Sequence, residues 1–148
     1  MKVRLRPVVA SDLPVHFEHQ ADPESAALAA VPSRDRDAFD THWARILADP
    51  AVVVLTIEAD GEVAGSALSF VRDGRRQVGY RIGREHWGRG VATAALTELV
   101  ARNVTDRPLF ARVAAHNPAS RRVLEKCGFR LVAREPDGDL EMLLLRLD

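Results

Sequence analysis

A short turn, Gly88-Arg89-Gly90, stands between a strand-like segment and a helix-like segment of the chain. Gly88 and Gly90 place no side chains where the backbone N–H groups of a new helix are still unpaired. Such a turn lets the backbone lie directly against an anion, and the helix N-terminus favours negative charge. The sequence therefore predicts a site for a phosphate-bearing ligand around this turn.

Two common phosphate-binding motifs do not fit the turn. A dinucleotide-binding fingerprint needs a third small residue at the position of Thr93 and an acidic residue on the following strand, and residues 109–115 contain no acid. A Walker A loop needs a lysine and a hydroxyl residue where this chain has Arg89 and Gly90. A dinucleotide fold and a nucleotide hydrolase are therefore disfavoured.

Length and composition set wide bounds. With 148 residues, of which 47% are hydrophobic, we expect one domain over residues 1–148 with a sizeable core. The formal net charge is zero, which argues against general nucleic-acid binding. Cys127 is the single cysteine, no apolar run reaches the roughly 18 residues of a membrane span, and the charged N-terminus is unlike a signal peptide. We therefore expect a cytoplasmic protein without a membrane partner.

Hydrophobic periodicity predicts the elements before the turn. Ser11 is expected to cap the first helix. Asp60-Gly61 and Asp73-Gly74 predict tight hairpin turns. The expected order is a strand over 3–6, a helix from Ser11, a looser helix or loop over 21–32, a helix over 34–48, and antiparallel strands over 52–57, 62–70 and 77–82.

After the turn the pattern changes. A helix over 91–103 leads to a strand over 109–115, which a helical crossover makes parallel to the strand before the turn. Asn117 is expected to cap the next helix and Gly128 to end it, and strands over 129–134 and 140–147 follow. The sequence predicts a mixed α/β fold: a six- to seven-stranded sheet, antiparallel in its N-terminal half and parallel after the glycine turn, with about four helices.

This order, with two motifs, resembles the GNAT superfamily of acyl-CoA-dependent N-acetyltransferases over essentially the whole chain. The family's turn reads Gln/Arg-x-x-Gly-x-Gly/Ala, and the matching segment is Trp87-Gly88-Arg89-Gly90-Val91-Ala92. Trp87 at its first position resembles the branch that acetylates the N-termini of ribosomal proteins. The second match is the block from Asn117 to Phe129, similar to that branch's Asn-x-x-Ser…Leu-Glu-Lys-x-Gly-Phe. Two ordered blocks are far more specific than either glycine pattern alone.

The resemblance implies that acetyl-CoA is the donor. Its pyrophosphate would lie on the backbone N–H groups from Gly88 to Thr93, and its pantetheine arm would enter a gap between strands 77–82 and 109–115. A backbone N–H of the first strand would bond the thioester oxygen. The residues so assigned to the cofactor are Ile82, Trp87, Gly88, Arg89, Gly90, Val91, Ala92, Thr93, Asn117, Ser120 and Arg121.

The resemblance also implies catalytic roles. Ser120 would donate a hydrogen bond to the departing CoA sulfur, against the alternative that its hydroxyl bonds its own helix backbone. Asn117 would bond the pantetheine arm, cap its helix, or do both. Tyr80 is expected to pack under a helix, and lining of the acceptor cleft is the alternative. Arg84, Arg89 and Arg121 are either phosphate ligands or solvated side chains.

No general base is evident. Many relatives carry glutamate where this chain has Gln77, and glutamine cannot take a proton. A water chain without a dedicated base is an equal alternative. The other candidates for a base, each more typical of a solvated or core-edge residue, are Glu62, Glu141, His16, His42 and His116.

The expected function is direct transfer of an acetyl group to a primary amine, either a protein or peptide N-terminus or a small molecule, without an acyl-enzyme and without a metal. The expected partners are acetyl-CoA and the amine acceptor, and a homodimer is left open. A CoA-binding regulatory or structural protein without catalysis is the alternative from another class. An antibiotic-modifying or toxin-type acetyltransferase would keep the chemistry and change the acceptor.

Overall fold

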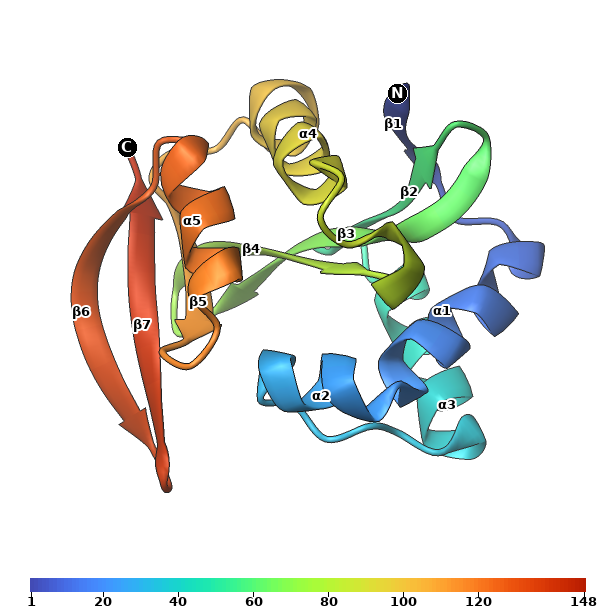
Figure 1. The fold of residues 1–148 in the computed structure, drawn as a ribbon, viewed down its shortest axis with the longest axis horizontal. Coiled ribbons are helices and arrows are strands. Elements are labelled where there is room, and N and C mark those ends of the chain that lie inside the picture. Colours follow the sequence, from blue (N-terminus) through green and yellow to red (C-terminus); the bar gives the residue numbers. More distant parts are fainter.

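The computed structural model describes residues 1–148 as a seven-stranded mixed sheet with helices on both faces (Figure 1). The strands lie side by side in the order β1-β2-β3-β4-β5-β7-β6. Their bounds are β1 (Val3–Pro7), β2 (Val53–Ala59), β3 (Glu62–Arg72), β4 (Arg75–Ile82), β5 (Leu109–Ala114), β6 (Arg130–Asp137) and β7 (Leu140–Leu147). The expected mixed sheet is confirmed.

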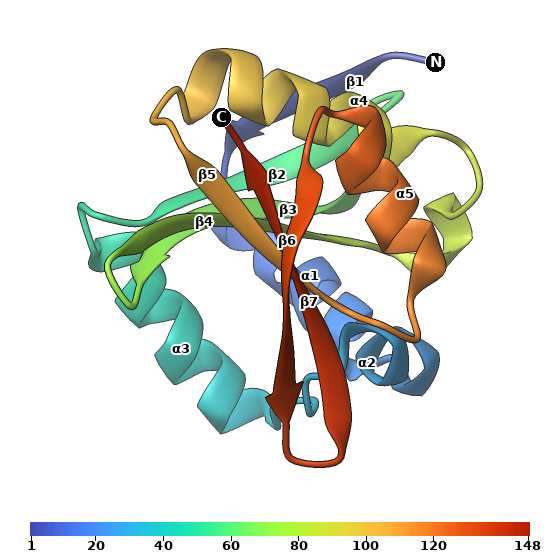
Figure 2. The same ribbon diagram turned by 90° about the vertical axis from the view of Figure 1, so that its left-hand side faces the viewer.

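Five α-helices cover the sheet: α1 (Leu13–Ala21), α2 (Pro23–Ala29), α3 (Arg36–Ala48), α4 (Val91–Glu98) and α5 (Pro118–Lys126). Short 3₁₀ turns, η1 (Ala10–Asp12) and η2 (Arg84–His86), precede α1 and the glycine turn, and a π-helical turn, η3 (Leu99–Asn103), continues α4. The first three α-helices lie on one side of the sheet, while α4 and α5 lie on the other side (Figures 1 and 2).

The strands β4 and β5 meet at a single point. All other neighbouring strands pair antiparallel along most of their length, but β4 and β5 are parallel and share only the residue pair Gln77↔Phe110. The two strands therefore separate between this pair and the end of β4, and the sheet opens into two halves there (Figure 1). The switch to parallel pairing after the glycine turn is confirmed.

The main core holds α4 against the opened sheet. Val91, Ala95 and Leu96 of α4 are almost fully buried, and Leu99 of η3 continues the same apolar face. They belong to one cluster with Ile57, Leu109 and Leu145 of the sheet. Burying a Leu or Ile side chain contributes about 1.5–3 kcal/mol to stability. Moving α4 along the sheet would expose several of these side chains, so the packing holds the start of α4 in place.

The structure corrects one expectation about the first helices and decides between the two alternatives for residues 21–32. Ser11 does not cap α1, because η1 comes first and the Asp12 carboxylate accepts the Val9 N–H instead. The segment 21–32 contains a fifth α-helix, α2, because Asp22 caps it by accepting the Glu24 N–H. Neither cap was assigned from the sequence.

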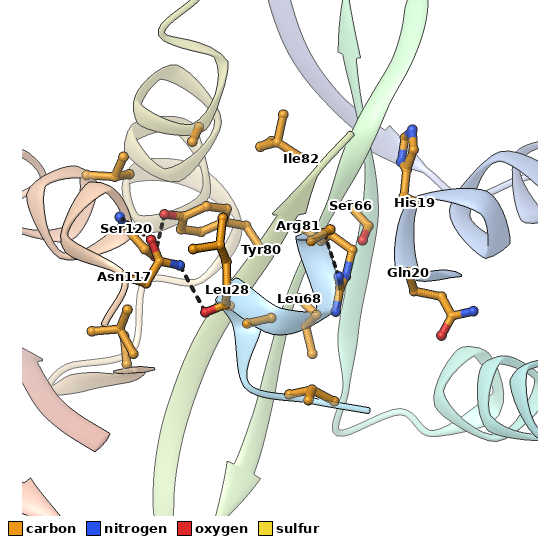
Figure 3. Close-up of a pocket in the computed structure, with 18 of the residues that line it drawn as sticks. His19, Gln20, Leu28, Ser66, Leu68, Tyr80, Arg81, Ile82, Asn117 and Ser120 are labelled. Carbon is orange, nitrogen blue, oxygen red and sulfur yellow. Dashed lines mark hydrogen bonds between the residues drawn. The ribbon is translucent and has the colours of Figure 1, made fainter. Parts of the chain in front are cut away.

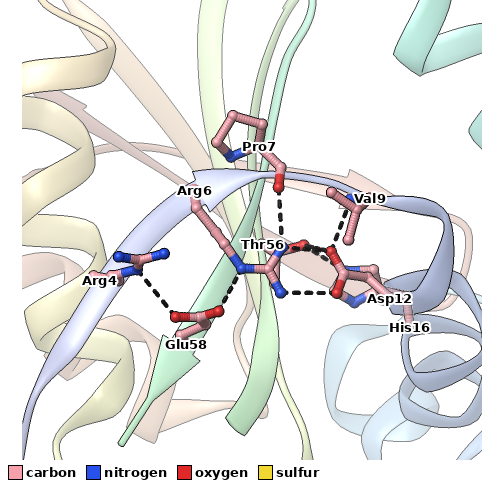
Figure 4. A network of polar contacts seen from close by, with 8 residues as sticks. All are labelled: Arg4, Arg6, Pro7, Val9, Asp12, His16, Thr56 and Glu58. Carbon is pink, nitrogen blue, oxygen red and sulfur yellow. Dashed lines mark hydrogen bonds and ion pairs between the residues drawn. The ribbon is translucent and has the colours of Figure 1, made fainter. Parts of the chain in front are cut away.

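A polar network joins β1, β2 and the start of α1 (Figure 4). The Arg6 guanidinium donates to both Asp12 carboxylate oxygens, at 2.7 and 2.8 Å, and also pairs with Glu58. The Thr56 hydroxyl donates to Asp12 Oδ2 at 2.9 Å, and His16 Nε2 lies 3.1 Å from that hydroxyl. The Arg6 guanidinium holds the pKa of the Asp12 carboxyl well below its usual range. This network places α1, and His16 on it, against the sheet.

We expect Asp12→Ala to lower the free energy of unfolding by about 3 kcal/mol, because it leaves the buried Thr56 hydroxyl and the Arg6 guanidinium without their shared acceptor. Urea denaturation followed by circular dichroism measures the loss. The matched control is Asp40→Ala, which removes only the exposed pair with Arg36 and should cost at most about 0.5 kcal/mol. Equal losses in the two variants would contradict a stabilising role for the network.

Candidate functional site

A cavity of about 730 Å³ reaches residues on both faces of the sheet where β4 and β5 separate. On one face it is lined by the glycine turn, the start of α4 and α5, and on the other face by α1, α2 and α3. Adjacent residues of β4 face opposite sides, so Tyr80 points toward α5 while Arg81 points toward α2 (Figure 3). The cavity volume is in the range of small-molecule and cofactor sites.

The glycine turn presents unpaired backbone donors to this cavity. Gly88 and Gly90 have φ angles of 73° and 79°, in the left-handed region that favours glycine. The backbone N–H groups of residues 88–93 donate to no acceptor in the chain, and the first helical bond runs from Ala94 N–H to Gly90 carbonyl at 3.1 Å. Together with the N-terminus of α4, these donors suit a phosphate group.

Trp87 anchors the turn to the end of β4. Its indole Nε1 donates to the carbonyl of Ile82 at 2.8 Å, and its ring packs against the main core. Both residues line the cavity. The indole therefore holds the glycine turn beside the last residues of the strand.

Asn117 caps α5 and Ser120 lies in its first turn, and both residues line the cavity. The Asn117 side-chain oxygen accepts the Ser120 N–H at 3.2 Å, which shows the expected cap, and its Nδ2 donates to the Leu28 carbonyl of α2 at 3.3 Å. The Ser120 hydroxyl lies 2.8 Å from the Tyr80 hydroxyl (Figure 3). Ser120 thus bonds a side chain across the cavity and not its own helix.

Tyr80 packs against the core as expected and also lines the cavity. Its ring is half-buried among core residues, but its hydroxyl reaches the cavity and contacts Ser120. Burial raises the pKa of the Tyr80 phenol, so the phenol stays protonated near neutral pH. The alternation of β4 places Tyr80 on this face, and only the three-dimensional position of α5 reveals the contact.

Most residues assigned to the cofactor line the cavity: Ile82, Trp87, Gly88, Gly90, Val91, Ala92, Thr93, Asn117 and Ser120. Arg89 does not, because it pairs with Asp60 at 3.7 Å and lies beside His86. Arg121 pairs with Glu125 at 3.5 Å along α5. Arg84 is held by Asp22 and Glu24.

The basic side chains of α5 that do line the cavity are Arg122 and Lys126. Sequence reasoning missed both. Their spacing of four residues places them on one helix face, three and seven positions after the cavity-lining Ala119, and this was the available signal.

The candidates for a general base separate into two groups. His16 and His42 line the cavity, whereas Glu62, Glu141 and His116 do not. Gln77 lines a separate cavity of about 100 Å³ at the other end of β4. A carboxylate at the Gln77 position would therefore face that smaller cavity.

His19 is a cavity residue that sequence reasoning missed. Its side chain is buried, neither ring nitrogen has a hydrogen-bond partner, and Nε2 lies 3.4 Å from Glu85 Oε1. The ring fills the space beside Gly83, where an added Cβ would lie 2.4 Å from Nε2. Burial lowers the pKa of His19, which favours the neutral ring. Its spacing of three residues from His16 on α1 was the signal for it.

Comparison with family models identifies the domain. The model described as acetyltransferase (GNAT) domain matches residues 2–130. The chain belongs to the GNAT acetyltransferase family. The comparison with curated proteins gives no match.

Solved GNAT structures share the fold at low sequence identity. Spermidine N-acetyltransferase from Vibrio cholerae, in complex with CoA and spermine, has a TM-score of 0.85 at 16% identity, covering 98% of this chain and 94% of that chain. The aminoglycoside acetyltransferase AAC(6')-Ib, in complex with ribostamycin and coenzyme A, has a TM-score of 0.81 at 19% identity, covering 99% and 93%. An acetyltransferase from Agrobacterium tumefaciens has a TM-score of 0.80 at 24% identity, covering 99% and 90%.

Other features of this GNAT domain bear on its chemistry. No three His, Cys, Asp or Glu side chains come together in an arrangement that holds a metal ion. None of the helices combines the length and apolar character needed to cross a membrane.

His16 is the most strongly perturbed imidazole in the GNAT cavity. Burial lowers the pKa of His16 to about 4, and its ring stacks on Trp43 with centroids 4.8 Å apart. Because the Thr56 hydroxyl donates to Asp12, that hydroxyl can only accept from His16 Nε2. The hydrogen-bond pattern thus assigns the proton to Nε2 and leaves Nδ1 as an acceptor.

The lowered pKa of His16 predicts a pH dependence of stability. A group with a depressed pKa stabilises the fold above its unfolded pKa, here 6.5, and this contribution is lost as the pH falls toward about 4. The difference corresponds to about 3 kcal/mol. We expect His16→Gln to unfold with a flatter pH dependence than the unmodified protein between pH 7 and pH 4, measured by urea denaturation. Parallel curves for the two proteins would contradict the buried neutral state of His16.

Proposed function

We propose that this GNAT domain transfers the acetyl group of acetyl-CoA directly to a primary amine. The observation that carries the proposal is that one cavity contains two sets of groups: the free backbone N–H groups of the glycine turn, and the hydroxyls of Ser120 and Tyr80. The first set of groups suits the pyrophosphate of CoA, and the second stands where the strands separate and a thioester has room. Solved relatives of this fold in complex with CoA support this donor.

The opened sheet supports the position of the donor's pantetheine arm. Beyond the pair Gln77↔Phe110, the β5-facing edge of β4 has no strand partner, so an amide-bearing chain can pair with it. The Asn117 side chain and the core-packed start of α4 border the same gap. A backbone N–H of β4 at this edge would stabilise the negative charge that develops on the thioester oxygen, a contribution of about 3 kcal/mol.

The chemical step needs no covalent enzyme intermediate. The amine nitrogen attacks the thioester carbon, the carbon–sulfur bond breaks, and the sulfur leaves with the bonding electron pair and takes up a proton. Ser120 would donate a hydrogen bond to that sulfur. The Tyr80 phenol would then donate to the Ser120 oxygen, so that the Ser120 hydrogen is free to point at the sulfur. The nitrogen loses a proton to water or to a cavity imidazole.

The acceptor is proposed as a protein or peptide N-terminus or a small-molecule amine. An α-amine has a pKa near 8, so part of it is unprotonated at neutral pH and a strong base is unnecessary. This suits a cavity that contains imidazoles but no carboxylate. The resemblance of Trp87 and of the block from Asn117 to the branch that acetylates ribosomal-protein N-termini supports the same acceptor class.

The proposal predicts acetyl-CoA binding through the glycine turn and release of free CoA thiol with amines. We expect Gly90→Val to weaken acetyl-CoA binding at least about 10-fold in titration calorimetry, because a β-branched residue is strained at this φ and the turn must shift. Gly74→Val is the matched control, since Gly74 has a φ of 73° but lies in the β3–β4 hairpin, away from the cavity.

Three outcomes of this test are informative. Absence of acetyl-CoA binding would refute the proposal. Tight binding without thiol release on a broad amine panel would favour the alternative of a catalytically silent CoA-binding protein. Equal effects of Gly74→Val and Gly90→Val on binding would show that backbone strain, and not the turn's donors, is responsible.

The role of Ser120 is tested separately. We expect Ser120→Ala to lower kcat by about 10-fold or more with a much smaller change in acetyl-CoA affinity, because the hydroxyl acts on the leaving sulfur. Tyr80→Phe, which keeps the ring but removes the donor to Ser120, should lower kcat in the same direction. Ser11→Ala, at an exposed serine outside the cavity, is the control. Unaltered kcat in a folded Ser120→Ala protein would remove the leaving-group role.

A further inference from the structure

The cavity contains cationic side chains and imidazoles but no carboxylate. Its ionisable lining is Arg34, Arg81, Arg112, Arg122, Lys126, His16, His19, His42, Tyr80 and His86, and neither aspartate nor glutamate is among the lining residues. Arg122 and Lys126 come from α5, on the side of the glycine turn. Arg81 points toward α2, away from Ser120 (Figure 3), and Arg34 is on the same side because its backbone N–H donates to Gln20 Oε1 of α1. We call the part of the cavity beside α1, α2 and α3, with Arg34 and Arg81, the acceptor half. Its cations have no lining carboxylate to balance them.

Arg81 is a half-buried cation without an anionic partner. Its Nη1 donates to the buried Ser25 hydroxyl at 2.8 Å, and this is its only hydrogen bond within the chain. The Nε and Nη2 edge of the guanidinium donates to no group. Burial, and then the charge of Arg34, lower the pKa of Arg81, so the surroundings disfavour its charge.

The Asp22 carboxylate, which acts on Arg81, is already engaged. Asp22 favours the charged form of Arg81, but both of its carboxylate oxygens accept hydrogen bonds from the Arg84 guanidinium, at 2.8 and 2.9 Å. Glu24 pairs with Arg84 as well. By contrast, Arg112 on the cavity wall does have acidic neighbours, Glu135 and Asp137. Arg122 and Lys126 on the α5 side also have no acidic partner, but both are exposed to solvent. Arg81 differs from them because it is half-buried without an anion.

There is room beside Arg81 for an additional group. Gly79 lies two residues earlier on the same face of β4, and a Cβ placed there would meet no atom within 4 Å. Ser66, paired with Arg81 across β3 and β4, and Gln20 of α1 also line this part of the cavity (Figure 3). Arg81 is therefore surrounded by open volume at Gly79 and by the polar side chains of Ser66 and Gln20.

Resting on the proposed function, we propose that the acceptor amine carries a carboxylate, which binds the free Nε–Nη2 edge of Arg81. This edge presents two parallel N–H donors, the geometry that matches a carboxylate in two hydrogen bonds. A bound carboxylate compensates a half-buried cation that the chain itself leaves unpaired. The same positive surroundings repel acceptors that carry several cationic groups and no anion.

A carboxylate of this kind has two sources: a small amino acid, or an acidic side chain near the N-terminus of a peptide. Matched probes distinguish them. Alanine is paired with alaninamide, and the dipeptide amide Ser-Glu-NH₂ with Ser-Gln-NH₂, while spermidine represents a polycation. Calorimetric titration of each probe into the protein saturated with CoA measures acceptor binding without turnover.

We expect the carboxylate member of at least one pair to bind roughly 10- to 100-fold more tightly than its amide, and spermidine to bind more weakly than that member. Arg81→Gln should abolish this preference, and Arg81→Lys, which keeps the charge but loses the fork, should restore part of it. Arg102→Gln, at an exposed residue outside the cavity, is the matched control and should keep it. Unchanged thermal melting of Arg81→Gln would show that the fold is intact.

The outcomes separate this inference from the proposed function. Lack of a preference in both pairs, including lack of any binding, overturns the inference, as does a preference that survives in Arg81→Gln. Selective binding without thiol release in a parallel assay would support the carboxylate site and contradict the acetyltransferase proposal. Thiol release with spermidine as the best acceptor would support the acetyltransferase and overturn the carboxylate site.

Discussion

The single pair between β4 and β5 is the constraint on which the candidate site depends. Parallel strands of a continuous sheet pair along their whole length, and their backbone groups are then unavailable to a ligand. Here Gln77↔Phe110 is the only contact of that kind, and the strands part toward the glycine turn. The opening is stable because antiparallel partners hold each strand on its other side: β3 pairs with β4 over eight residue positions and β7 pairs with β5 over six. The unpaired strand edge is thereby built into a rigid frame.

Helix packing completes that frame from outside the opening. The buried face of α4 fixes the position of the unpaired N–H groups at its start, and the Trp87 indole ties the preceding turn to the last residue of β4. On the other half, the Asn117 cap and its bond to the Leu28 carbonyl hold α5 and α2 at the border of the cavity. Donors and hydroxyls are therefore positioned before any ligand arrives, which limits the ordering cost of binding.

Local sequence signals predicted the parts of this arrangement that are themselves local. Aspartate-glycine pairs mark turns because both residues accept positive φ, as Asp60 and Gly61 do at 51° and 82°. Asn117 caps α5 through a bond only three residues long. The errors concern contacts between distant segments. Ser11 lost its expected role because Asp12 is drawn into a network with Arg6 and Thr56, and the latter is 44 residues away.

The same distinction explains which site residues escaped prediction. The contact between Tyr80 and Ser120 joins residues 40 positions apart, and the Arg81 bond to Ser25 spans 56. Periodicity says which face of a strand a residue occupies, but not what covers that face. The Arg89 side chain was expected to be either a phosphate ligand or solvated; sequence alone does not show its neighbour Asp60 at 3.7 Å, which the β2–β3 hairpin brings near.

The two halves of the cavity differ in whether backbone groups or side chains line them. This difference decides which half a relative of the same fold can be expected to share. In the proposed function, acetyl-CoA would be bound largely by backbone N–H groups and a separated strand edge, which are features of the backbone, and the Vibrio cholerae enzyme shares the fold at 16% sequence identity. The acceptor half relies on side chains of α1, α2, α3 and β4, which such identity leaves free to differ. The spermine of that complex is a polycation, whereas the acceptor half here holds Arg34 and Arg81 without a carboxylate. If the two proposals hold, a shared backbone supports one donor while the charge of the opposite wall selects a different acceptor.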